Sequence, residues 1–258
     1  MNKYKMVLEY DGTNYSGWQT QKNAKSIQGT LIAAAQTFLG VPVDIQGAGR
    51  TDAGVHALGQ VAHLECTKKM NPETLRIGIN DQLPAGINIL QVTNTDLRFH
   101  ARHSAVSRSY LYLIAKRRTA FGKKYVWWIK DHLHISKMQL ALEVFSGFHD
   151  FASFADKRMD KDTSTKVDVE KVQLKDLDGL IALRVVGSHF LWKMVRRIVG
   201  ITAEAGRGKL SPKDIEQMLT SYSEAPAHFT APPSGLYLEK VLYEGDQLPE
   251  IQPPIYLI

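Results

Sequence analysis

The sequence concentrates chemically active side chains in one glycine-rich segment, residues 47–56. Three of its first eight residues are glycine, which permits positive φ and a close approach of the backbone to a ligand. Arg50 and Asp52 bring opposite charges into the same predicted turn. Neither a P-loop nor a dinucleotide-binding glycine pattern is present, because the Gly-Lys-Ser/Thr sequence and the GxGxxG spacing are both missing. Taken alone, such a segment is more typical of a surface turn than of an active site.

A second unusual segment is the apolar run of residues 190–198, which contains Arg196 and Arg197. An unpaired cation buried in an apolar run is very costly, so at least one arginine should have a carboxylate or phosphate partner. The alternative, that both extend their aliphatic stems into solvent, is equally compatible with the sequence.

The histidines give no metal-binding pattern. His100 with His103, and His132 with His134, lack the HExxH or Cys/His spacing of known metal sites. A lone HxH pair is far more often structural, and we therefore predict no metal.

Composition limits the class of protein and its compartment. The chain has 258 residues, of which 44% are hydrophobic, and this excludes a disordered protein. Cys66 is the only cysteine, so no disulfide can form within the chain, which is typical of a reducing compartment. Charged residues interrupt the N-terminal segment and no run of about 18 apolar residues occurs. We therefore expect a cytoplasmic protein that neither enters a membrane nor is secreted.

The positive charge is concentrated in two stretches that also contain aromatic residues. Residues 98–137 contain ten Lys and Arg against one Asp, although the whole chain carries only +6. Residues 184–213 contain seven against one Glu. Cations neutralise phosphates and aromatic rings stack on unpaired bases, which favours an RNA-like ligand. A solvated charged face above a core of aromatic rings explains the composition equally well. The residues we predict to bind RNA are Arg102, Arg108, Lys116, Arg117, Arg118, Lys123, Lys124 and Arg197.

Hydrophobic periodicity predicts an α+β fold made of two related halves, with helices packed on mostly antiparallel sheets. The predicted strands are residues 3–10, 43–46, 55–65, 87–92, 109–115, 180–186 and 236–243. The predicted helices are the segment between Ser26 and Gly40, residues 72–80 and 136–145, and a long helix marked by Phe190 and ending near Gly206. We expect an N-terminal half at residues 1–103 that carries the glycine-rich loop, a C-terminal half at 104–245 and a Pro-rich tail at 246–258.

Taken together and in order, these motifs closely resemble the TruA family of tRNA pseudouridine synthases. The resemblance covers about residues 3–244, and the run from Gly49 to Ala57 is its most specific part. The other matching segments are Tyr10–Thr13, Gly17–Gln19, Ser26–Gly29, Phe99–Arg102, Arg108–Tyr112, Gly147–Phe151, Phe190–Leu191, Met194–Arg196, Ala231–Pro233 and Gly235–Leu238.

The resemblance implies isomerisation of uridine to pseudouridine in the anticodon arm of tRNA, typically at positions 38, 39 and 40. It further implies that no cofactor or metal takes part, that the enzyme is a homodimer and that the two halves join across a central basic cleft. By motif match, Asp52 is the catalytic aspartate, Arg50 is a neighbouring arginine of the same motif, Tyr110 stacks on the target base and Arg196 pairs with the aspartate. Arg197 lies about 100° further round the predicted helix, so we expect it to contact solvent or RNA.

Some positions depart from the TruA pattern and keep two alternatives open. Thr20 stands where many relatives have Arg, Ser164–Lys166 replaces a common Thr-Val-Arg, and residues 246–258 are an added tail. One alternative is a paralogue with the same chemistry on another tRNA or rRNA uridine. The other is a non-catalytic RNA-binding or RNA-folding protein, which is disfavoured because binding alone needs no aspartate in a basic cleft. Three roles of Asp52 remain possible, namely attack on the ribose C1′, attack on the base C6, and assistance to elimination.

Overall fold

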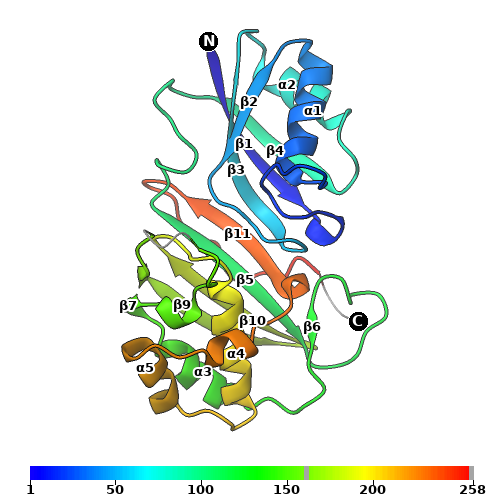
Figure 1. Cartoon of the computed structure of the whole chain (residues 1–258). Coiled ribbons are helices and arrows are strands. Elements are labelled where there is room, and N and C mark those ends of the chain that lie inside the picture. The colour runs from blue at the N-terminus through cyan, green and yellow to red at the C-terminus, as the bar shows by residue number, and fades with distance from the viewer. Residues whose placement is uncertain (160–162, 256–258) are drawn as a thin grey trace. The chain divides into compact units, whose positions relative to one another are not determined.

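The computed structural model describes residues 1–159 and 163–255, which divide into two compact units (Figure 1). Unit 1 is Met1–Val106 together with Tyr237–Leu248, and unit 2 is Ser107–Leu236 with the described residues from Pro249 onward. The chain passes from unit 1 to unit 2 after Val106, close to the boundary expected at residue 103. The other boundary differs from our expectation, because residues 237–248 belong to unit 1 and not to the C-terminal half. Residues 256–258 of the expected tail lie outside the described residues.

Unit 1 is built on a mostly antiparallel sheet with the order β4-β1-β3-β11, and β2 also pairs with β3. Its strands are β1 (Asn2–Tyr10), β2 (Val43–Gly47), β3 (His56–Cys66), β4 (Ile87–Asn94) and β11 (Leu236–Leu242). Alternate residues of β1 face the core, as the period of two predicts. β11 pairs with β3 in parallel at His56 and Ala57, and this pairing explains why residues 237–248 belong to unit 1.

Two helices pack against the sheet of unit 1, α1 (Ile27–Leu39) and α2 (Pro72–Asn80), and a 3-10 turn, η1 (Gly12–Asn14), follows β1. The ends of α1 lie where the sequence predicts them. The Ser26 hydroxyl accepts a hydrogen bond from the Gly29 N–H at 3.2 Å, and Gly40 ends the helix in the left-handed conformation. Both predicted helices of this unit are confirmed.

In unit 2, β10 lies between β5 and β9 and is antiparallel to both. β10 is buried at every position, as expected of a strand with a neighbour on each edge. A separate hairpin joins β7 to β8, and β6 adds to β5 in parallel. The strands are β5 (Ser107–Ala115), β6 (Trp127–Trp128), β7 (Gly147–Asp150), β8 (Lys166–Val169), β9 (Lys171–Leu177) and β10 (Leu180–Gly187). We did not predict β6, β7, β8 or β9 from the sequence.

The helices of unit 2 are α3 (Ile135–Glu143), α4 (Met194–Gly206), α5 (Pro212–Thr220) and α6 (Ala225–His228), with 3-10 turns η2 (Ala152–Phe154) and η3 (Pro233–Gly235). α4 begins at Met194 and not near Phe190, because Lys193 adopts a left-handed conformation with φ of 64° that a helix cannot include. Each unit thus combines a mostly antiparallel sheet with packed helices, and the predicted α+β class is confirmed. None of the helices described here is both long enough and apolar enough to cross a membrane.

Candidate active site

Hydrogen bonds to Thr51, the residue next to Asp52, and to Gly49 fix the glycine-rich loop of unit 1. The Thr51 hydroxyl and the Tyr10 hydroxyl are 2.8 Å apart, and Tyr10 extends from the end of β1. Gln60 of β3 donates to the Gly49 carbonyl at 2.9 Å. Burial raises the pKa of Tyr10 to about 12, so this phenol keeps its proton and its hydrogen bond at physiological pH.

Close backbone packing explains why glycine occurs at fixed places in the neighbouring motifs. A Cβ on Gly17 would lie 2.4 Å from the Thr51 carbonyl oxygen, and a Cβ on Gly12 would lie 2.0 Å from that of Val55. The Trp18 N–H donates to the same Thr51 oxygen at 3.1 Å. These contacts bring the segment after β1 against both sides of Asp52, and any larger residue would displace the loop.

Asp52 itself lies half-buried at the turn of this loop. The Val55 N–H donates to the Asp52 carbonyl at 3.1 Å, and this backbone hydrogen bond closes the turn. Arg50 is exposed and donates from Nε to the Gln19 side chain at 3.1 Å. His56 is buried at the end of the loop, where its ring stacks on Tyr237 of β11 with centroids 4.9 Å apart. The fold therefore fixes the backbone of Asp52 firmly.

Unit 2 supplies the other two predicted catalytic residues. Tyr110 lies on β5, where its ring meets Phe190 edge-on with centroids 5.0 Å apart. Arg196 lies in the first turn of α4 and donates from Nε to the Ala231 carbonyl at 2.7 Å. Asp52 belongs to unit 1, and the pairing of Arg196 with Asp52 therefore stays a prediction, as does stacking of a base on Tyr110.

The proline-containing motif near the end of unit 2 positions Arg196. Phe229 packs so closely on α4 that a Cβ on Gly200 would lie 1.5 Å from the Phe229 carbonyl oxygen. The Tyr112 hydroxyl of β5 donates to the Pro232 carbonyl at 2.8 Å. The segment between Phe229 and Pro232 is thus held by α4 and by β5, and its Ala231 carbonyl fixes the Arg196 side chain.

The expected contact of Arg197 with solvent is wrong, and its contact with RNA stays a prediction. Arg197 is only 6% exposed, and its Nη1 donates to the backbone carbonyls of Ser153 and Ala155. Burial lowers its pKa. We had considered only carboxylate, phosphate or solvent as partners for a cation in this apolar run. Backbone carbonyls beside η2, more than forty residues away in sequence, stabilise it instead.

Most of the other residues predicted to bind RNA are exposed, namely Arg102, Lys116, Arg117, Arg118, Lys123 and Lys124. Arg108 is half-buried and donates to the Ser188 carbonyl at 2.9 Å, and Lys116 pairs with Asp176. Arg184, from the second basic stretch, is 2% exposed and belongs to the core. The first basic stretch is therefore available to a polyanion, whereas part of the second is structural. Lys157 and Arg158 are exposed cations that the sequence analysis did not select, because they lie outside both stretches.

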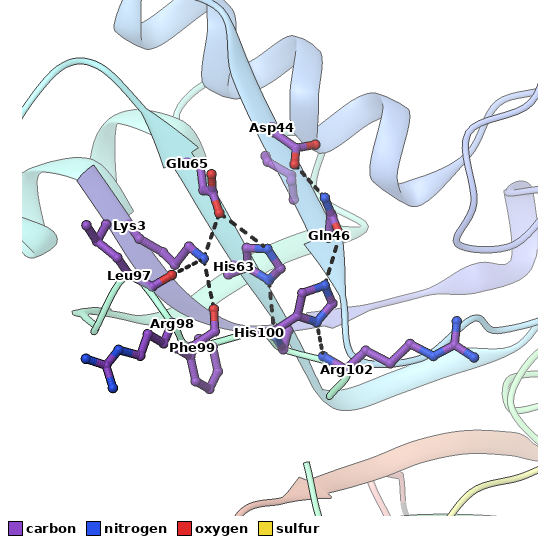
Figure 2. A network of polar contacts seen from close by, with 12 residues as sticks. Lys3, Asp44, Gln46, His63, Glu65, Leu97, Arg98, Phe99, His100 and Arg102 are labelled. Carbon is purple, nitrogen blue, oxygen red and sulfur yellow. Dashed lines mark hydrogen bonds and ion pairs between the residues drawn. The ribbon is translucent and has the colours of Figure 1, made fainter. Parts of the chain in front are cut away.

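A histidine network fixes the loop that carries Arg102 (Figure 2). His63, buried on β3, accepts a hydrogen bond at Nδ1 from the Ala101 N–H at 3.1 Å. His100 accepts at Nδ1 from the Arg102 N–H at 3.2 Å, and its Nε2 lies 3.2 Å from the Gln46 side chain. Lys3 extends from β1 to donate to the Leu97 and Phe99 carbonyls. The Phe99–Arg102 motif thus holds its arginine on a rigid turn, and among the described residues no group of His, Cys, Asp or Glu is arranged to bind a metal ion.

This network predicts a loss of stability in mild acid. Burial lowers the pKa of His63 and His100 below the ordinary value of 6.5, and both rings accept hydrogen bonds as neutral imidazoles. The unfolded chain therefore binds more protons than the folded chain as the pH falls through about 6.5, and the free energy of unfolding decreases there. Denaturant titrations at about pH 7.5 and 5 should show a smaller decrease for His100→Asn, whose amide oxygen keeps an acceptor. His228→Asn, on the surface, should behave like the parent. An equal decrease in the parent and His100→Asn would contradict the prediction.

Comparison with known proteins assigns the class and then the family. The family described as tRNA pseudouridine synthase matches residues 6–104 and 141–244, which include the glycine-rich loop and α4. A match of this extent in both units defines the chain as a pseudouridine synthase, an isomerase. The chain belongs to the TruA family of tRNA pseudouridine synthases, as its motifs led us to expect.

Individual relatives match over nearly their whole length. The tRNA pseudouridine synthase A of Geotalea uraniireducens (strain Rf4) is 40% identical over 245 residues, which cover 94% of this chain and 100% of that protein. The protein of the same name from Acetivibrio thermocellus is 38% identical over 245 residues, and that from Bacillus sp. (strain KSM-64) is 37% identical over 246 residues, both with the same coverage. The similarity therefore covers most of this chain and the whole length of each of these three relatives.

Proposed function

We propose that this chain isomerises uridine to pseudouridine in the anticodon stem-loop of tRNA, at positions 38, 39 and 40, with Asp52 as the nucleophile. The observation that carries the proposal is the complete run from Gly49 to Ala57, with a half-buried aspartate on a rigid turn, in a member of the TruA family. We also propose that the enzyme acts in the cytoplasm as a homodimer, as the resemblance implies.

The reaction requires three kinds of group. The C–N glycosidic bond of the uridine must break, the uracil must turn while it is held, and a C–C bond must form from C5. A nucleophile, a cation and an aromatic surface serve these steps, and Asp52, Arg196 and Tyr110 are the candidates. Because a uridine in a stem is stacked, it must also be flipped out, at a cost of a few kcal/mol that backbone contacts offset.

Tritium release from a tRNA transcript labelled at C5 of its uridines tests the reaction, because the C5 hydrogen is lost when the new C–C bond forms. Mapping of pseudouridine in the product then tests the site. Release with modification at positions 38–40 supports the proposal. Release from another position would identify a paralogue, and tRNA binding without release would favour the non-catalytic alternative.

The exposed cations of residues 98–137 predict a steep dependence of tRNA binding on salt. Each neutralised phosphate contributes a slope of about −0.7 to −0.9 in log K against log salt, so five contacts give about −4. Reversing the charges of Lys116, Arg117 and Arg118 should reduce the slope by about 2 to 3 if each meets one phosphate. The measurement is a filter-binding titration at several salt concentrations.

A matched control for this titration is the reversal of Lys69, Lys171 and Lys175, three exposed lysines outside both basic stretches. It changes the net charge by the same amount and should leave the slope near that of the parent. A parent slope near −1 would mean that residues 98–137 form a solvated face and do not bind the phosphates.

A further inference from the structure

A cleft of about 320 Å³ lies within unit 2. Its volume is at the lower end of the range for small-molecule sites, roughly 300–1,000 Å³. The charged residues that line it are four cations and two carboxylates, which gives a net charge of +2: Lys157, Arg158, Lys193, Arg197, Asp156 and Glu224. The excess of cations indicates an anionic ligand.

Asp156 organises the cations of this cleft. It is 7% exposed and accepts hydrogen bonds from Arg158 Nε at 3.0 Å and Arg158 Nη2 at 3.1 Å, and Lys193 Nζ lies 2.7 Å from its Oδ2. The hydrogen bond from Arg158 and that from Lys193 hold the pKa of Asp156 well below its usual range. Both carboxylate oxygens of Asp156 therefore accept hydrogen bonds from cations. One negative side chain fixes two positive ones, and this group of three residues keeps a net positive charge.

Arg197 provides a second, independent sign of a ligand. Its Nη1 is bonded to backbone carbonyls, but its buried Nε has no hydrogen-bond partner within residues 1–159 and 163–255. A buried donor without an acceptor costs free energy, and buried polar groups are nearly always satisfied. Because Arg197 lines the cleft, an oxygen atom of a ligand bound there could supply the missing acceptor.

Trp192 adds an aromatic surface next to these cations. It is 38% exposed, and the Arg158 guanidinium lies 4.2 Å from the centre of its ring system. The next residue, Lys193, has a φ of 64°, a strained conformation for a residue with a Cβ. Strain of this kind persists where the surrounding structure requires it and is concentrated at functional sites. In this protein the residue with the strained backbone, Lys193, is also the one whose side chain pairs with Asp156.

We propose that this cleft binds one nucleotide of the tRNA substrate, with its phosphate at Lys193 and Arg197 and its base stacked on the layer of Arg158 and Trp192. RNA-binding proteins stack unpaired bases both on aromatic rings and on guanidinium planes. This inference rests on the proposed function for the identity of the RNA. It adds a nucleotide-binding site in unit 2, whereas the loop of Asp52 belongs to unit 1.

Binding of a tRNA transcript to the full-length protein, measured by filter binding, tests the site through Arg158. Arg158→Gln should raise the Kd for tRNA about fivefold or more, because the guanidinium plane on which the base stacks is lost. Lys175→Gln, which removes the same charge from an exposed position on β9, should leave the Kd for tRNA unchanged.

Variants of Trp192 test the stacking. Trp192→Ala should raise the Kd for tRNA about fivefold or more, because loss of one base–aromatic stack costs about 1–3 kcal/mol. Trp192→Phe should retain most of the affinity, and circular dichroism should show that both variants are folded. A tRNA Kd that is unchanged in both Arg158→Gln and Trp192→Ala would overturn the proposal.

A free nucleotide offers the same phosphate and base, so uridine monophosphate is titrated in parallel while tryptophan fluorescence is followed. Quenching that is lost in Trp192→Phe, together with weakened tRNA binding by Arg158→Gln, supports the site. Quenching with unchanged tRNA affinity in Arg158→Gln would identify a site for free nucleotides and overturn the RNA assignment. Because these titrations need no turnover, a parent that binds tRNA but releases no tritium would refute the proposed function and still leave the cleft testable.

Discussion

We expect Asp52→Asn to abolish pseudouridine formation and to leave tRNA affinity and the free energy of unfolding close to those of the parent. The amide has the shape of the carboxylate but cannot act as a nucleophile, so turnover should fall by at least about a thousandfold. The fold should tolerate the change, because the turn around Asp52 is closed by the backbone bond from Val55 and by the bond between Thr51 and Tyr10.

Single-turnover tritium release with saturating enzyme measures this effect without interference from product release. Asp81→Asn, at an exposed aspartate after α2, is a matched control and should retain parent activity. Pseudouridine formation by Asp52→Asn within tenfold of the parent rate would remove Asp52 from its proposed role.

Arg196→Met should lower turnover strongly, most of all at low pH. A cation near a carboxylate favours its ionised, nucleophilic form, so loss of the cation should move the acidic limb of the rate profile to higher pH. The same substitution removes the hydrogen bond from Arg196 to the Ala231 carbonyl, which should cost about 1.5–3 kcal/mol of unfolding free energy. Arg196→Lys should restore turnover only in part, because an ammonium group lacks the planar fork of the guanidinium.

Arg197→Met separates the roles of the two neighbouring arginines. Arg197 is buried against the carbonyls of Ser153 and Ala155, so its loss should lower stability and tRNA affinity while kcat at saturating tRNA is retained. If Arg197→Met were the variant with a low kcat, and Arg196→Met isomerised normally with an unshifted pH profile, the pairing of Arg196 with Asp52 would be wrong.

The parts of the fold that the sequence predicts have strong local signals. Ser26 and Gly40 delimit α1, and the alternation along β1 identifies its buried face, because caps and period-two patterns are encoded by neighbouring residues. The short strands β7 and β8 have only four residues each, too few to establish a period. α5 could have been predicted, since Ser211 and Asp214 form a capping box around Pro212.

The candidate site shows the same division between local and distant information. The glycine-rich loop and its aspartate are identified from contiguous residues. The partners of Arg197 are carbonyls from a turn far away in sequence, and no periodicity in residues 190–198 indicates them. The sequence does not indicate Asp156 either. Its role depends on ion pairs with Arg158 and with Lys193, and three strands, β8, β9 and β10, separate Asp156 from Lys193 along the chain.

The return of β11 to unit 1 also has a consequence for how the protein is made. β2 pairs with one end of β3, and β11 pairs with His56 and Ala57 at the other, where a Cβ on Gly59 would lie 2.8 Å from the Glu239 carbonyl oxygen. A ribosome synthesises residues 107–235 before it reaches this strand. During that time the end of β3 next to the glycine-rich loop lacks its parallel partner. We therefore expect the glycine-rich loop of unit 1 to gain its full support only after residues 236–242 have been synthesised.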